Sequence, residues 1–222
     1  MNILNKTLKI LQSFFLGIFM ISFAIAFVIL FRPYYYLNIS ILNLEQETGY
    51  SYEVIKDAFD DVMDFLVLNE EFGTGELKYS EDGKSHFEDC KKLFTFDFVC
   101  LYISSLFLIV IFVLKKTKII QLEYKKFSPG IYAIIWVGAA FLVLGIWGAI
   151  DFDSLFTAFH KVCFPGKDNW MFSPYQDQII NILPTQLWMN YCILIVFILL
   201  LFIASFIIIE VYRKKELKKL TK

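Results

Sequence analysis

The chain has 222 residues, of which 58% are hydrophobic and 18% aromatic, and its formal net charge at pH 7 is −1. This composition is far more apolar than that of a soluble globular protein, so it excludes that class and indicates an integral membrane protein. The basic residues lie at the ends of apolar segments rather than in a patch, which argues against nucleic-acid binding.

Four apolar segments predict membrane-spanning helices, because a helix needs about 20 apolar residues to cross ~30 Å of hydrocarbon. The segments are about 8–31, 94–114, 131–150 and 191–212. The first is longer than the ~7–15-residue core of a signal peptide and no small-x-small cleavage motif follows it, so we interpret it as an uncleaved anchor. We predict an all-α integral membrane protein: a single membrane domain over residues 1–222, built as a four-transmembrane-helix bundle with a helical extracytoplasmic cap.

The distribution of Lys and Arg predicts the orientation of the chain. If both termini are cytoplasmic, thirteen basic residues lie inside, in the termini and in loop 115–130, and eight lie outside, in loops 32–93 and 151–190. Cytoplasmic loops carry the excess of positive charge in membrane proteins. We therefore expect cytoplasmic termini and an extracytoplasmic position for both histidines, His86 and His160.

Loop 32–93 begins with three tyrosines, residues 34–36, which we expect at the membrane interface, where Tyr is enriched. Residues 48–66 then carry apolar side chains at helical spacing and acidic side chains on the opposite face, which predicts an amphipathic helix. Thr48 or Ser51 is the expected N-cap. We interpret the acidic face as a solvated one.

Residues 85–98 run into the second span without a helix breaker, so one continuous helix is expected there. Its face toward the bundle would carry His86, Asp89, Cys90, Leu93 and Asp97. An ionisable group inside a span indicates function by default, but Asp97 is equally consistent with a boundary carboxylate paired with Lys91 or Lys92. The sequence leaves these two interpretations open.

Loop 151–190 contains a second short helix, which Asp153 can cap and which Pro165-Gly166 ends. This helix carries Phe156, Phe159, His160, Cys163 and Phe164. The irregular, aromatic stretch that follows is typical of a re-entrant or interfacial cap. An extracytoplasmic position permits a disulfide between Cys90 and Cys163, and the sequence does not decide whether it forms.

The sequence contains no GxGxxG, GxxxxGK[ST], HExxH, GxSxG or CxxC motif, so nucleotide-driven chemistry is not expected. Two histidines at the membrane boundary, each near carboxylates, suggest an acid/base pair. The plainer alternative is that each is an ordinary hydrogen-bonded histidine. A metal site built from both histidines and nearby aspartates is a weaker alternative, because two imidazoles are few ligands.

Two segments, 86–94 and 159–188, resemble the signatures of the bacterial lipoprotein intramolecular transacylase family, Lit. The matching positions are His86, Asp89, Phe159, His160, Phe164, Trp170, Pro174, Asp177, Pro184 and Trp188. The four-span layout with outer histidines is also similar, so the resemblance covers nearly the whole chain. Cys90 stands where the family pattern has an aliphatic residue.

The resemblance implies an acyltransferase of the bacterial cell membrane that needs no cofactor and no metal. Its reaction would move an acyl chain from the glycerol of a diacylglyceryl-cysteine lipoprotein to the α-amine of that cysteine. The lipoprotein and membrane lipid would be its partners, and a monomer with no nucleotide or nucleic-acid partner is expected.

The resemblance also implies a set of catalytic and substrate-binding residues. One imidazole would be the general base, with His160 favoured, but the sequence does not decide between the two histidines. His86 would then support the oxyanion, and Asp89 or Asp177 would hold one imidazole in its working tautomer. The acyl chains would contact Trp170, Phe159, Phe164, Trp188 and Tyr175.

Two other functions fit the pattern of spans. One is a non-enzymatic membrane sensor or assembly partner, because loop 32–93 carries fourteen acidic residues that would bind a protein or a cation. The other is a small transporter, for which four spans and one intramembrane carboxylate form a thin permeation path.

Overall fold

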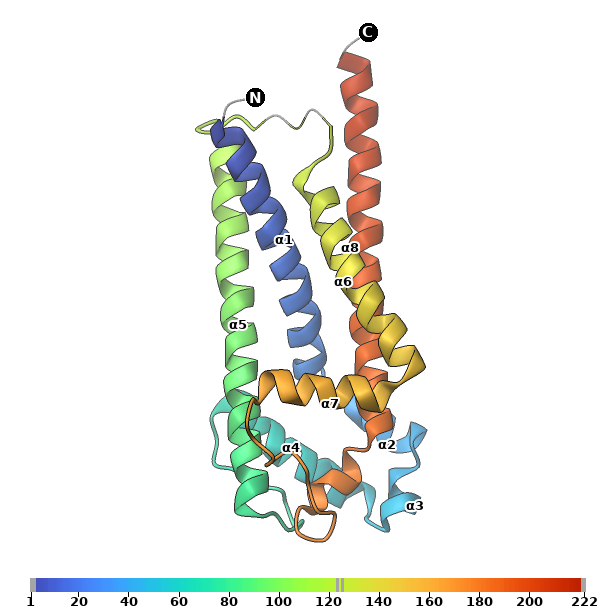
Figure 1. Ribbon diagram of the computed structural model, residues 1–222. Helices are drawn as coiled ribbons and strands as arrows, with labels where there is room; N and C mark the ends of the chain where they lie inside the picture. The colour runs from blue at the N-terminus through green and yellow to red at the C-terminus, as the bar shows by residue number, and fades with distance from the viewer. Residues whose placement is uncertain (1–2, 123, 125, 221–222) are drawn as a thin grey trace. The chain divides into compact units, whose positions relative to one another are not determined.

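The structure is a computed structural model that describes residues 3–122, 124 and 126–220. Lys125 and Lys222, which contribute to the predicted cytoplasmic charge, lie outside the described residues. Within the described residues the regular structure is helical, without strands (Figure 1). The helices are α1 (Ile3–Leu30), α2 (Pro33–Ile41), α3 (Leu44–Thr48), α4 (Tyr52–Leu68), α5 (Glu81–Lys116), α6 (Pro129–Ile150), α7 (Phe152–Cys163), the 3-10 helix η1 (Gln178–Ile182) and α8 (Thr185–Leu220).

Four helices, α1, α5, α6 and α8, are long and apolar enough to cross a membrane. The predicted all-α architecture with four transmembrane helices is therefore confirmed. α5 has 36 residues, about 54 Å at 1.5 Å per residue, which exceeds the ~30 Å hydrocarbon core. Its excess length carries the first turns, which contain His86, beyond the most apolar stretch of the helix.

The described chain divides into two compact units. The first unit contains the residues up to Ala26, from Phe98 to Ile146, and from Leu194 onward. Aromatic rings hold its helices together: Phe15 of α1 stacks on Phe107 of α5 with ring centroids 4.2 Å apart. The second unit, Phe27–Asp97 and Trp147–Ile193, contains both histidines, the helices α2, α3, α4, α7 and η1, and one end of each of the four long helices.

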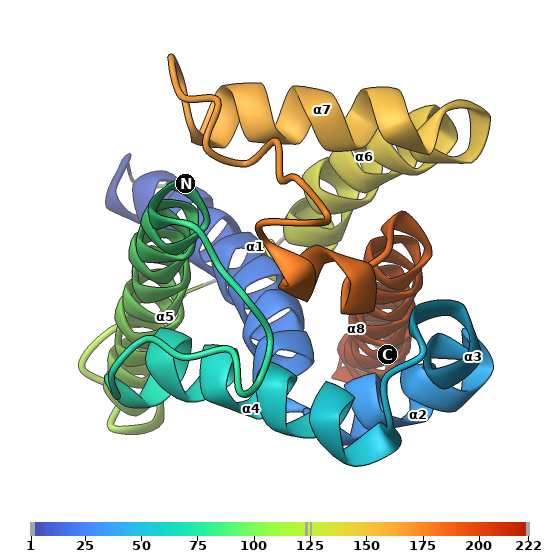
Figure 2. The same cartoon turned by 90° about the horizontal axis from the view of Figure 1, so that it is seen from below.

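α4 supplies much of the core of the second unit. Its apolar face is buried as the periodicity predicts, and the buried side chains are Ile55, Ala58, Phe59, Val62, Met63, Phe65 and Leu66. Ser51 is the N-cap, because its Oγ accepts a hydrogen bond from the Val54 amide at 3.4 Å, whereas Thr48 is the last residue of α3. Seen from below, α4 and α7 lie on opposite sides of the segment that contains η1 (Figure 2).

The tyrosines that follow Arg32 pack into the second unit, so the interfacial-belt prediction is wrong for Tyr35. Tyr35 is fully buried, stacks on Phe59 with ring centroids 3.6 Å apart, and donates a hydrogen bond to the Ile182 carbonyl at 3.0 Å. The cause is α2, a helix that the sequence pattern did not predict. It turns the chain so that Tyr35 faces α4 and η1.

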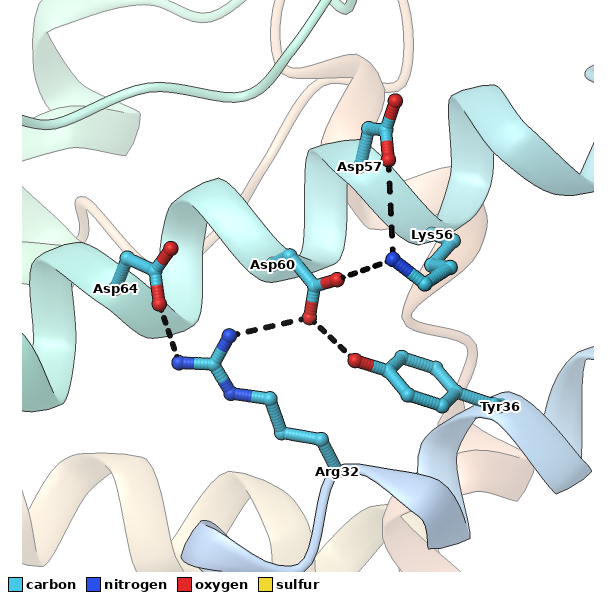
Figure 3. A network of polar contacts seen from close by, with 6 residues as sticks. All are labelled: Arg32, Tyr36, Lys56, Asp57, Asp60 and Asp64. Carbon is cyan, nitrogen blue, oxygen red and sulfur yellow. Dashed lines mark hydrogen bonds and ion pairs between the residues drawn. The ribbon is translucent and has the colours of Figure 1, made fainter.

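The acidic face of α4 is only partly solvated, which corrects the second expectation for this loop. Asp60 accepts hydrogen bonds from Tyr36 at 2.7 Å and Lys56 at 2.8 Å, and lies 3.2 Å from the Arg32 guanidinium (Figure 3). The same guanidinium binds Asp64 at 2.5 Å. The charges therefore attach α4 to the start of α2, and fewer of them are available to an outside partner.

Candidate active site

α7 is a short helix whose ends are set by local sequence. Asp151 caps it by accepting a hydrogen bond from the Ser154 amide at 2.9 Å, so the cap is Asp151 and not the predicted Asp153. The helix ends at Cys163, two residues before Pro165, as predicted, and Gly166 follows with a φ of +73°. A proline cannot donate the next helical hydrogen bond, and glycine tolerates the left-handed region.

The two histidines meet within the second unit. His86 lies in the second turn of α5 and His160 in the last turns of α7, and their ring centroids are 5.8 Å apart with the planes inclined by 28°. Both residues are buried, with 6% and 7% of their surface exposed. Two histidines that are 74 positions apart in the sequence therefore lie next to each other in the fold.

The hydrogen bond of His160 fixes its tautomer. Its Nδ1 lies 2.7 Å from the carbonyl oxygen of Phe156, one turn earlier on α7. A carbonyl oxygen can only accept, so Nδ1 carries the proton and donates, and Nε2 of the neutral ring keeps its lone pair. Burial lowers the pKa of His160 below its ordinary value of 6.5, and the Phe156 hydrogen bond only partly opposes this. His160 is therefore neutral near pH 7 and has a basic nitrogen at Nε2.

His86 has a different environment. Its Nε2 lies 3.4 Å from the Cys90 sulfur, and its Nδ1 is buried without a hydrogen-bond partner among the described residues. The rings of Phe164 and Phe172 stand nearly perpendicular to the imidazole, with centroids at 4.9 and 5.4 Å. The ring is therefore enclosed by apolar walls while one of its nitrogens is left without a partner.

Asp89 joins α5 to the loop that follows α7. Its carboxylate binds Lys167 at 2.5 Å and Lys92 at 3.1 Å, and accepts a hydrogen bond from Asn169 at 3.3 Å. Asp89 is 8% exposed, so the ion pair with Lys167 is shielded on the carboxylate side. Among the described residues Asp89 makes no hydrogen bond to an imidazole, and it secures the loop instead of a histidine tautomer.

Asp177 performs a similar task at the start of α5. It accepts hydrogen bonds from the Ser80 amide and hydroxyl, both at 2.8 Å, and lies against Gly83. Within the described part of the chain it has no hydrogen bond to either histidine. The tautomer of His160 depends on the Phe156 backbone carbonyl. The expectation that Asp89 or Asp177 holds one of the two imidazoles is therefore not met among the described residues.

Three of the predicted substrate-binding aromatics surround the histidines. Trp170 and Phe159 lie 4.8 and 5.4 Å from the His160 ring, measured between centroids. Phe164 lies 4.9 Å from the His86 ring and 5.8 Å from the His160 ring. These three side chains form the apolar surroundings of the imidazole pair.

Trp188 and Tyr175 lie farther from the pair. Trp188 lies 6.3 Å from the Phe156 ring and donates a hydrogen bond to the Leu183 carbonyl at 3.2 Å. Tyr175 is 88% exposed and lines a surface cavity of about 590 Å³ that also contacts Tyr79. Trp188 thus contacts Phe156, which in turn contacts His160, and Tyr175 lies on the surface away from both imidazoles.

Cys90 and Cys163 are free thiols, so the disulfide that the compartment permits is absent between them. Lys92 binds Asp89 and Lys91 binds Asn69, so the two lysines proposed as partners of Asp97 have other partners. No group of three His, Cys, Asp or Glu side chains in the described residues is arranged to hold a metal ion.

The sequence pattern did not indicate the roles of Phe156, Lys167, Asn169 and Phe172. Phe156 acts through its backbone carbonyl, which every residue type has, so the sequence could not reveal this role. Lys167 and Asn169 belong to a polar turn directly after the helix that carries His160, and this position was the available clue.

The sequence matches the family described as lipoprotein intramolecular transacylase Lit over residues 10–188, a range that includes both histidines and the residues around them. The chain belongs to this family. The resemblance found from the two histidine segments is therefore confirmed, and the Lit family is one of acyltransferases. Both segments that carry the resemblance, 86–94 and 159–188, lie inside the matched range.

Solved structures of a Lit protein share the fold of this chain. The Bacillus cereus Lit structure superposes with a TM-score of 0.84 at 23% identity over 99% of both chains, which establishes the shared membrane fold. Two structures of histidine-substituted variants of that Lit, one to arginine and one to alanine, give TM-scores of 0.80 and 0.77. An uncharacterized protein of Aquifex aeolicus is 27% identical over 155 residues, covering 67% of this chain and 66% of that protein.

Proposed function

We propose that this chain is a lipoprotein intramolecular transacylase. Its reaction moves an acyl chain from a glycerol oxygen of a diacylglyceryl-cysteine lipoprotein to the α-amine of the same cysteine, and leaves an N-acyl lyso-lipoprotein. The amine nitrogen attacks the ester carbonyl, a C–N bond forms, the ester C–O bond breaks, and one proton passes from nitrogen to the glycerol oxygen. The observation that carries the proposal is the buried His160 with an unprotonated Nε2 beside His86.

His160 is the general base and later the general acid. An α-amine has a pKa of about 7.7–8.0, so a useful neutral fraction is present near pH 7. Nε2 of His160 accepts the proton that the attacking amine must lose and returns it to the leaving glycerol oxygen. A general acid/base of this kind contributes about 10²–10⁴-fold to the rate.

The remaining rate enhancement comes from positioning and from stabilising the oxyanion of the tetrahedral intermediate. His86 stands close enough to His160 to serve that oxyanion. The substrate provides its own nucleophile, so a serine elbow or a catalytic thiol is unnecessary. Conversion of an ester into an amide runs downhill without ATP, so the proposed reaction needs no phosphate-binding loop and no cofactor.

We also propose the side of the membrane on which the reaction occurs. The chain is a multi-pass membrane protein, and the distribution of Lys and Arg supports cytoplasmic termini and an extracytoplasmic site. The proposed unit of activity is a monomer. Single cysteines placed at exposed positions near His86 and His160, in a background without native cysteines, test the topology: reaction with a membrane-impermeant maleimide added to intact cells is expected, and labelling only after lysis contradicts it.

The activity is tested with purified protein and a synthetic diacylated lipopeptide in detergent, without added cofactor. Mild base cleaves ester-linked acyl chains but not an amide-linked one. Mass spectrometry after this treatment therefore distinguishes the N-acyl product, which keeps the transferred chain, from the O-acyl substrate, which loses it. We expect conversion by the native protein and a loss of at least about 10²-fold in His160→Ala. Full conversion by both His160→Ala and His86→Ala overturns the mechanism, and no conversion by the native protein overturns the function.

A further inference from the structure

Cys90 lies one helical turn after His86 on α5, and its sulfur is 3.4 Å from Nε2 of that histidine. The other ring nitrogen of His86, Nδ1, is buried without a hydrogen-bond partner in the described part of the chain. A neutral imidazole carries its proton on one nitrogen and accepts with the other. The partner of Nε2 therefore decides which form of His86 faces the site.

We infer that Cys90 is a positioning residue that holds His86 in the Nδ1–H form by donating its S–H to Nε2. A thiol is a weak donor through its S–H, and its sulfur is a weak acceptor. An imidazole lone pair is a strong acceptor by comparison, so the S–H···N arrangement uses the better donor–acceptor combination. Nδ1 has no protein partner in the described part of the chain in either arrangement; with N–H···S it would be a lone pair, whereas with S–H···N it is an N–H that is free to donate to a substrate.

This assignment makes the two histidines complementary. His160 presents an acceptor, Nε2, because its Nδ1–H is bound to the Phe156 carbonyl. His86 presents a donor, Nδ1–H, because its Nε2 is bound to Cys90. The role in catalysis depends on the transacylase function proposed above: one ring then takes the amine proton while the other donates to the oxyanion. With the opposite tautomer of His86, the neutral pair would offer two lone pairs and no donor.

The tautomers can be read directly, because the chain contains only two histidines. The full-length protein is labelled with ¹⁵N-histidine, reconstituted in detergent micelles, and studied above pH 7 by long-range ¹H–¹⁵N correlation spectra. The His160→Gln variant assigns the signals by elimination. We expect a protonated Nδ1 for His86, a shift of the population toward Nε2–H in Cys90→Ala, and the native pattern in Cys90→Ser, whose hydroxyl donates in place of the thiol.

Cys163→Ala is the matched control, because that thiol lies on α7 and makes no hydrogen bond to either ring among the described residues. The control should leave both tautomers unchanged. A protonated Nε2 on His86 in the native protein, or the same His86 tautomer in the native protein and in Cys90→Ala, overturns the inference. If Cys90→Ala does not fold, the spectra of the native protein and of Cys90→Ser still decide.

Kinetics with the lipopeptide give the second measurement. Loss of one neutral hydrogen bond corresponds to a fall of about 3- to 10-fold in kcat, with KM unchanged and with recovery in Cys90→Ser. An unchanged kcat in Cys90→Ala contradicts the catalytic role. The spectra report the tautomer of His86 without any turnover. A wrong tautomer assignment is therefore distinguishable from a failure of the transacylase function, which only the lipopeptide assay detects.

Discussion

The Nδ1 atom of His160 and the carbonyl oxygen of Phe156 lie 2.7 Å apart on consecutive turns of α7. The contact leaves the helix with an imidazole whose basic nitrogen is the outer one, Nε2. The stationary partner is backbone, so no side-chain substitution at position 156 removes it. This relationship makes His160, rather than His86, the better candidate for the general base.

The pH dependence of the reaction should show this lowered basicity. Burial lowers the pKa of His160, so its protonation, and the resulting loss of base catalysis, occurs below pH 6.5. The substrate amine, with a pKa of about 7.7–8.0, imposes a separate rise in rate at higher pH. Single-turnover rates across the acidic and neutral range should therefore show two limbs, the more acidic one below pH 6.5 and absent in His160→Ala. An acidic limb at higher pH contradicts the assignment.

The same shift predicts how acid affects stability. Between the folded and the unfolded pKa of His160 the unfolded chain binds more protons, so stability decreases as the pH falls through that window below 6.5. The melting temperature of the native protein should decrease more than that of His160→Gln when the pH is lowered from about 7 to about 5. Equal decreases for the two proteins contradict the prediction.

The Lys167–Asp89 ion pair should hold the loop that follows α7. Lys167→Met leaves the buried Asp89 carboxylate with fewer partners, and we expect a loss of about 1 kcal/mol, reduced from larger values because Lys167 is 45% exposed. Activity should fall further, by about 10-fold or more, because small displacements of catalytic groups are costly. Thermal melting and the lipopeptide assay measure the two effects.

Lys92→Met is the control for this prediction. Lys92 binds the same carboxylate, but its side chain is 76% exposed, so its removal should change stability by less than about 0.5 kcal/mol. Equal losses of stability and activity in the two lysine variants would show that the Lys167–Asp89 ion pair has no special role in holding the loop.

The network around Asp60 should stabilise the second unit. Asp60→Asn removes the charge that Arg32, Tyr36 and Lys56 share, and we expect a loss of about 1–2 kcal/mol. The control is Asp57→Asn, because Asp57 is 69% exposed and only 3.9 Å from Lys56, so its effect should be near zero. Melting temperatures measured at one scan rate compare the variants, since membrane proteins often unfold irreversibly.

The difference between native protein and Asp60→Asn should also depend on pH. Burial would raise the pKa of Asp60, but the hydrogen bonds from Lys56, Tyr36 and Arg32 outweigh it and lower the pKa below 3.8. The contribution of the carboxylate is therefore complete above pH 3.8 and is lost as the pH falls through the folded pKa. A stability difference that grows on acidification contradicts this sign.

Gly83→Ala should loosen the start of α5. A Cβ at this position overlaps the Asp177 carboxylate that receives the Ser80 hydrogen bonds. Overpacking of this kind costs about 1–3 kcal/mol, which exceeds the ~1 kcal/mol that alanine gains over glycine in a helix. Gly145→Ala in α6 is the control, because a Cβ there meets no atom within 4 Å and should leave stability unchanged or raised. A melting temperature of Gly83→Ala at or above the native value contradicts the prediction.

The amphipathic helix shows how far periodicity predicts this structure. The apolar face of α4 is buried as its spacing indicates, because helical geometry alone places those side chains on one side. The partners of its acidic face were not predictable, because Arg32 and Tyr36 reach Asp60 only after α2 has turned the chain. The wrong prediction for Tyr35 has the same cause, because α2 turns this side chain into the core of the second unit.

The candidate site divides in the same way. Local sequence determined which residues bear its chemistry: two histidines among long apolar spans, the helix that ends before Pro165, and the aromatics near His160. Only the tertiary structure decided their partners. It placed the two imidazoles side by side and paired Asp89 with Lys167 and Asp177 with Ser80, whereas the contact between His86 and Cys90 follows from their i, i+4 spacing on α5. The reason is physical. Spans and helix faces follow from hydrophobicity and from spacing along one helix. The hydrogen bonds between α5 and the loop after α7 instead join residues about 80 positions apart, and these residues approach each other only when the intervening chain packs.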